Sequence, residues 1–85
     1  MSKETDHLIH LCNNASVALS NLKCVVSPLP RHMADCSNDL RNGRGISVGN
    51  LEYKASIIKQ AATEALRCVA SAHAYASKLK EESEV

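Results

Sequence analysis

The side chains of this chain that are best suited to catalysis or metal binding are its four cysteines and four histidines. Metal sites usually bring two ligands within a few positions of each other along the chain, but neighbouring cysteines here are separated by at least eleven residues. His7 and His10 can share a helix face, yet no carboxylate or thiolate stands at ligand spacing beside them. We therefore expect no metal site, no cofactor and no catalytic centre, and the sequence favours a protein that is not an enzyme.

The cysteines are expected to remain reduced thiols. The first residues, Met-Ser-Lys-Glu, lack the apolar stretch of a secretory signal, so the sequence predicts a cytoplasmic protein, and disulfides are rare in that compartment. A free cysteine on an apolar helical stripe behaves as a small hydrophobic residue. We therefore expect Cys12, Cys36 and Cys68 to fill the core, whereas Cys24 lies off the main stripe.

Anion binding is the other chemistry that the residue types allow. Arg41 and Arg44 flank a turn that contains Gly43 and Gly45, just before a predicted helix. Free backbone N–H groups at a helix N-terminus attract anions, and two arginines can complete a phosphate or carboxylate site. A solvated loop whose arginines cap the preceding helix explains the same residues, and we favour that interpretation.

Basic residues are also in excess along the second half of the chain. Between Arg41 and Lys80 the sequence has seven lysines and arginines against two acidic residues, although the net charge of the whole chain is only +1. The candidate residues for binding a nucleic acid or another anion are Arg41, Arg44, Lys59, Arg67 and Lys80.

An apolar repeat predicts the longest element and a helix-packing surface. Residues 51–79 carry apolar side chains at alternating steps of four and three, without proline or glycine, which is a heptad pattern typical of a long helix that packs lengthwise on another helix. Many of these side chains are alanines, which allow helix axes to approach closely. The predicted interface consists of Leu51, Ile58, Ala62, Ala65, Val69, Ala72 and Ala76.

Prolines and glycines divide the chain into three predicted helices. An apolar face recurs at helical spacing in residues 5–27, Pro28 and Pro30 interrupt it, and a short helix over residues 31–42 ends at Gly43. A third helix is predicted over residues 47–82, with Ser47 as its cap. We expect residues 1–85 to form one all-α domain, a small bundle of two helices plus one short helix.

The composition predicts that this bundle is incomplete as a single copy. The chain has 85 residues, no Phe, no Trp and only two tyrosines, so the core lacks the large area that aromatic side chains bury. Domains of this size are marginally stable unless something supplements the core. We therefore expect a homodimer, and we expect no membrane span because no apolar run is long enough.

Two functions are compatible with these patterns. The one we favour is a non-catalytic interaction module that dimerises through the alanine-rich repeat and binds a partner protein. The alternative is a helical dimer that lies along the phosphate backbone of double-stranded RNA or DNA without reading the bases. Small viral suppressors of RNA silencing are similar in architecture, since they use helical dimers of comparable size, but the chain matches none of their residue motifs.

Overall fold

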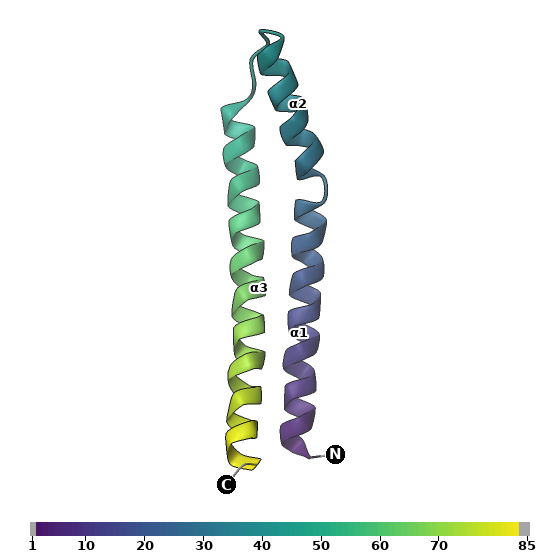
Figure 1. The fold of residues 1–85 in the computed structure, drawn as a ribbon, viewed down its shortest axis with the longest axis vertical. Coiled ribbons are helices and arrows are strands. Elements are labelled where there is room, and N and C mark those ends of the chain that lie inside the picture. Colours follow the sequence, from purple (N-terminus) through teal and green to yellow (C-terminus); the bar gives the residue numbers. More distant parts are fainter. Residues whose placement is uncertain (1, 84–85) are drawn as a thin grey trace.

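The chain is a helical hairpin. A computed structural model describes residues 2–83, which form α1 (Lys3–Val26), α2 (Leu29–Arg41) and α3 (Val48–Ser83) and contain no strand. Figure 1 shows α1 and α2 lying end to end beside the antiparallel α3, with both chain ends at the same end of the rod. The all-α prediction is confirmed. The single domain over residues 1–85 stays a prediction, and residues 1, 84 and 85 lie outside the described part.

Local side-chain chemistry accounts for the helix ends. Ser2 caps α1, because its Oγ accepts a hydrogen bond of 3.1 Å from the backbone N–H of Thr5. The Oγ of Ser47 accepts a similar bond of 3.2 Å from the N–H of Asn50 and caps α3, as the sequence predicts. Gly43 has φ +74°, a left-handed conformation that glycine adopts without steric cost and that stops the helical path after α2.

The break between α1 and α2 is shorter than the sequence predicts. We expected a second helix from residue 31, but α2 begins at Leu29 with Pro28 as its N-cap. Ser27 keeps right-handed helical angles, and its N–H still donates to the carbonyl of Lys23 at 2.8 Å. Proline is tolerated where a helix begins because the first N–H groups have no partner within the helix. Two prolines therefore bend the path without reversing it.

The residues that α1 and α2 turn toward α3 form one row. Successive members lie three and four positions apart, the spacing continues through the bend, and every member is buried or half-buried: Leu8, Leu11, Ala15, Ala18, Leu22, Val25, Leu29, His32, Cys36 and Asp39. The corresponding row of α3 has the same spacing and consists of Leu51, Lys54, Ile58, Ala61, Ala65, Cys68, Ala72, Tyr75 and Leu79. We call these two sets the inward rows.

The inward row of α3 coincides with the predicted repeat only at every seventh residue, at positions 51, 58, 65, 72 and 79. Between these positions the structure turns the residues at 54, 61, 68 and 75 inward, and leaves the predicted residues at 55, 62, 69 and 76 on the neighbouring flank. Both flanks of α3 are apolar enough to pack, so hydrophobic pattern alone does not decide which one meets α1.

The hairpin is closely packed at one end and open at the other. Cα atoms of α1 and α3 approach within 8 Å of each other, whereas no Cα of α2 lies that close to α3 within residues 2–83. The closest packing involves alanines, because Ala15, Ala18 and Ala65 are the buried apolar residues of the described chain. Small side chains allow a short distance between helix axes, and the larger ones beyond the bend do not.

A rod of this shape encloses very little core. Its dimensions are 66 × 19 × 17 Å, and its radius of gyration is 19.4 Å. A compact domain of the same length would have a radius of gyration of about 12 Å. Among the described helices, none combines the length and the apolar character that crossing a bilayer requires.

The close packing of α1 on α3 predicts the effect of enlarging Ala65, which is only 3% exposed. Ala65→Leu should lower the free energy of unfolding by about 1–3 kcal/mol, because the added atoms force the two helices apart. Ala70→Leu is the matched control, since Ala70 is exposed on the same helix and both residues are good helix formers. Urea unfolding followed by circular dichroism measures both, and equal values for the two variants would contradict the packing described here.

Candidate interaction face

The structure places the candidate anion-binding residues far apart. Arg41 and Arg44 lie at the loop end of the rod, whereas Lys59, Arg67 and Lys80 are spread along α3. At 1.5 Å per residue, Lys59 and Lys80 are separated by about 31 Å along the helix axis. These side chains therefore do not form one site within the hairpin.

Two of the candidate arginines bind carboxylates of their own chain. Arg44 Nη2 lies 3.0 Å from Asp39 Oδ1. Arg67 donates from Nε to Glu64 Oε2 at 3.1 Å and from Nη2 to the other carboxylate oxygen. Both pairs are exposed to solvent, where water and salt screen them, so each contributes little to stability. An anionic ligand would have to compete with these carboxylates.

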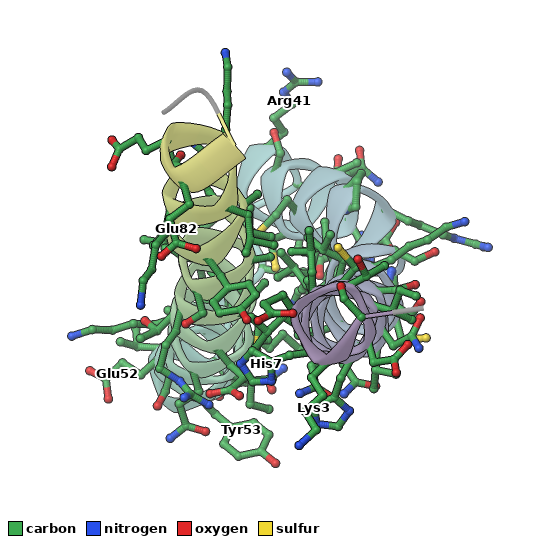
Figure 2. The ribbon with its side chains drawn as sticks, turned by 90° about the horizontal axis from the view of Figure 1, so that it is seen from below. Lys3, His7, Arg41, Glu52, Tyr53 and Glu82 are labelled. Atoms are coloured by element: carbon green, nitrogen blue, oxygen red, sulfur yellow. The ribbon has the colours of Figure 1, made fainter. Side chains whose placement is uncertain are left out.

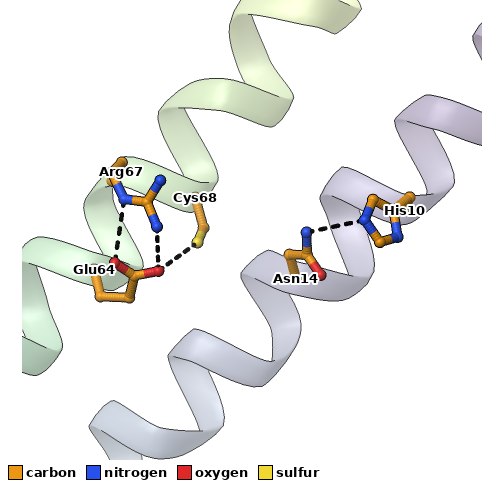
Figure 3. Close-up of polar contacts among 5 residues, drawn as sticks. All are labelled: His10, Asn14, Glu64, Arg67 and Cys68. Carbon is orange, nitrogen blue, oxygen red and sulfur yellow. Dashed lines mark hydrogen bonds and ion pairs between the residues drawn. The ribbon is translucent and has the colours of Figure 1, made fainter.

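One side of the rod, which we call the polar face, carries the side-chain hydrogen bonds between His10 and Asn14 and among Glu64, Arg67 and Cys68 (Figure 3). On α1, Asn14 Nδ2 donates to His10 Nε2 at 3.4 Å. On α3, the Cys68 thiol donates to Glu64 Oε1 at 3.5 Å, beside the Arg67 pair. Asn14, Glu64, Arg67 and Cys68 line one groove on this side, together with Leu11, Val17, Ala18, Asn21 and Ser71.

Desolvation and the contact with Glu64 favour the neutral form of the Cys68 thiol. Desolvation, followed by its hydrogen bond to the Glu64 carboxylate, raises the pKa of the Cys68 thiol, so less of it is thiolate at neutral pH. The hydrogen bond from Arg67 lowers the pKa of Glu64, which keeps that carboxylate ionised. The arrangement is suited to holding a neutral thiol on the surface.

The prediction that Cys12 fills the core is wrong. Cys12 is exposed, because the inward row of α1 runs through Leu11 and Ala15 and leaves Cys12 one position to the side. Cys36 and Cys68 are half-buried and Cys24 is exposed. Among the described residues, no cluster of three His, Cys, Asp or Glu side chains is placed to hold a metal ion.

Histidines contact neighbours in two further places. The rings of His7 and Tyr75 meet edge to face with centroids 4.7 Å apart, and this contact joins the first turns of α1 to the last turns of α3. Figure 2 shows His7 on the same side of the rod as Tyr53. Farther along, Cys36 Sγ and His32 Nε2 lie 3.7 Å apart on successive turns of α2.

The side opposite the polar face exposes mostly apolar and small side chains, although Lys23 also lies on this flank of α1. The apolar and small side chains lie one position beyond the inward rows, on the flank where Cys12, Leu19 and Val69 line a shared groove of about 510 Å³. We call this set the apolar face: Ile9, Cys12, Leu19 and Val26 on α1, Met33 and Leu40 on α2, and Ala55, Ala62, Val69 and Ala76 on α3.

The apolar face extends into the opening between α2 and α3. There Met33 and Leu40 line a hollow of about 470 Å³ together with Cys36, Ser37, Arg41, Ile46 and Leu51. Met33 is 51% exposed and Leu40 is 56% exposed. Apolar side chains that gather on one side and stay in contact with water are typical of surfaces that bind another molecule.

The predicted interface is divided between the two surfaces of α3. Leu51, Ile58, Ala65 and Ala72 belong to the inward row and face the other arm of the hairpin. The predicted residues at 62, 69 and 76 lie on the apolar face. Sequence reasoning missed the half of that face on α1 and α2, although Cys12, Leu19, Val26, Met33 and Leu40 recur at every seventh position and carry the signal.

No protein-family model matches the chain, and no curated protein or solved structure is significantly similar to it.

The hydrogen bond between Cys68 and Glu64 predicts a change in thiol reactivity. Glu64→Gln removes the negative charge that raises the pKa of Cys68, so the thiolate fraction should increase and alkylation at slightly alkaline pH should be faster. Cys24, which is exposed on α1, is an internal control whose rate should not change. Mass spectrometry of alkylated peptides measures both rates. Unchanged alkylation of Cys68 would show that Glu64 does not control it.

Proposed function

We propose that the chain is a non-catalytic interaction module that forms a homodimer through the apolar face, which turns two hairpins into a four-helix bundle. The observation that supports this proposal is the exposed area, 6525 Å². A compact monomer of this mass would expose about 4,900 Å², so the hairpin has about 1,600 Å² in excess. A standard protein–protein interface buries about 800 Å² per partner, and obligate dimers bury more. The excess is large enough for either.

The pattern of α3 supports this proposal. Its inward row meets α1, and on the proposal the row at Ala55, Ala62, Val69 and Ala76 meets the second copy at the same heptad spacing. A helix with two adjacent apolar rows is typical of a four-helix bundle, in which each helix contacts two neighbours. The heptad repeat of the sequence is thus shared between packing within the chain and packing between chains.

Binding of double-stranded nucleic acid has weaker support. Such binding requires several cationic side chains that contact successive phosphates. Arg44 and Arg67 hold carboxylates of their own chain, and the remaining candidate cations lie at separate places along the rod. We therefore propose a second copy of the chain as the partner. Binding of duplex nucleic acid is the alternative that the experiments below test.

The proposal predicts that Cys12 becomes protected as dimers form. Cys12 is exposed in the single hairpin and lies in the groove of the apolar face, whereas Cys24 is exposed outside that face. Alkylation of Cys12 should therefore slow as the protein concentration rises through the dissociation constant, while alkylation of Cys24 stays constant. A ratio of the two rates that does not depend on concentration would argue against a dimer formed through this face.

A charge placed on the apolar face should dissociate the dimer. Val69→Asp introduces a carboxylate that the second copy would have to desolvate, whereas Val17→Asp makes the same change on the polar face. Both valines are exposed in the hairpin, at 42% and 62%, so both variants should keep their helicity. Analytical ultracentrifugation should give a monomer for Val69→Asp and a dimer for Val17→Asp. Equal association of the two variants would refute the proposed surface.

Titration with labelled duplex RNA and DNA at low and moderate salt tests the alternative function. We expect no salt-sensitive binding by the unmodified chain, by Lys59→Ala or by Arg67→Ala, and we expect Arg67→Ala to leave dimerisation unchanged because Arg67 lines the groove of the polar face. Binding that weakens steeply with salt, and more so in these variants, would instead support the duplex-binding function.

A further inference from the structure

We propose that the two copies lie antiparallel, so that α3 packs on α3 of the second copy and the arm formed by α1 and α2 packs on the same arm. This inference rests on the proposed dimer and specifies its geometry. Two hairpins that pack face to face with two-fold symmetry have only two simple arrangements. In the parallel arrangement the rods point the same way and α3 packs on the α1–α2 arm instead.

The apolar row of α3 has its centre at the midpoint of the helix, so the row overlaps fully with the same row of an antiparallel copy. Its members at positions 55, 62, 69 and 76 lie symmetrically about a point between residues 65 and 66, which is also the midpoint of α3 (Val48–Ser83). An antiparallel copy in full overlap therefore pairs Ala55 with Ala76 and Ala62 with Val69 of the second copy. Three of the four residues in this row are alanines, and this allows the two helices to approach closely.

The other arm of the hairpin has its centre at the same level of the rod. One groove is lined by both Ala15 and Ala72, and another by both Ala18 and Cys68, so residue 21 lies level with residues 65 and 66. Reversal about this level places Ile9 against Met33 of the second copy. These two apolar side chains are 45% and 51% exposed in the single hairpin. Met33 lines the opening between α2 and α3, so the second copy would cover that opening.

The charges along the outer rim of α3 favour the same arrangement. Reversal about residues 65 and 66 brings Glu52 opposite Lys80 of the second copy and Lys59 opposite His73, and two-fold symmetry produces each pair twice. In the parallel arrangement Glu52 and Lys80 of the two copies remain about 42 Å apart along the rod. Leu66, which is 71% exposed, lies at the centre and meets Leu66 of the second copy.

Cross-linking between chains that carry single thiols distinguishes the two arrangements. Alanine replaces all four cysteines, and three further chains then carry Ile9→Cys, Met33→Cys or Ala76→Cys. A short bifunctional thiol reagent is added to mixtures of two chains. The Ile9→Cys and Met33→Cys mixture should give a covalent dimer, whereas the Ile9→Cys and Ala76→Cys mixture, which the parallel arrangement brings together, should not.

A charge exchange on the chain with its native cysteines provides a second measurement. Glu52→Lys and Lys80→Glu should each raise the dimer dissociation constant, by roughly 2- to 10-fold, because each replaces two attractive pairs by repulsive ones. The double variant should return the constant to nearly its original value. Lys78→Glu is the matched control, because Lys78 lies on the other flank of α3 and should not rescue Glu52→Lys.

The outcomes separate this inference from the proposed function. Cross-linking of Ile9→Cys with Ala76→Cys, or a dimer that gives neither cross-link and no rescue by charge exchange, would overturn the antiparallel arrangement while leaving the dimer itself intact. A chain that stays monomeric at all concentrations would overturn both. If the cysteine-free chain does not associate, the charge exchange decides the orientation.

Discussion

The close contact between alanines of α1 and α3 determines the rest of this structure. Ala15, Ala18 and Ala65 allow the two helices to approach closely, but they bury little area in doing so. The two helices are therefore closest where their side chains are smallest, while larger apolar side chains such as Leu19, Met33 and Val69 remain exposed. A rod 66 Å long and less than 20 Å across has no interior in which to place them.

Two different surfaces result from this constraint. The polar face pairs several of its side chains with one another, such as Glu64 with Arg67, although it also exposes Val17. The apolar face has no comparable arrangement, and Leu19, Met33 and Val69 remain in contact with water. On the proposed function, a second copy removes this area from water, and the stability of the fold depends on protein concentration.

The features that the sequence predicts correctly are set by neighbouring residues. Ser47 and Gly43 determine helix ends through a local hydrogen bond and a backbone conformation, so they can be recognised from the sequence alone. The ion pair that occupies Arg67 also has a local signal, because Glu64 lies three positions before it on the same helix. This spacing indicates that Arg67 is paired within its own helix, which argues against Arg67 as an anion-binding residue.

The rotation of each helix about its own axis, which decides which residues face the other helix, cannot be predicted from the sequence in the same way. A shift of one residue in the row that faces the other helix replaces Leu11 by Cys12 on α1, or Cys68 by Val69 on α3. Each of these side chains is suited to an apolar contact. The predicted interface on α3 therefore mixed residues that pack within the chain with residues of the apolar face. The half of the apolar face on α1 is not distinguishable from the inward row in the sequence alone, because a wide apolar stripe resembles a single surface that faces the core.

Small-angle X-ray scattering on the unmodified chain tests the central claim most directly, because it reports mass and length together. A side-by-side dimer that covers the apolar face should scatter with the mass of two chains while its longest dimension stays near the 66 Å of one hairpin. The mass of one chain at high concentration, or the mass of two chains with a length near twice that value, would contradict the account.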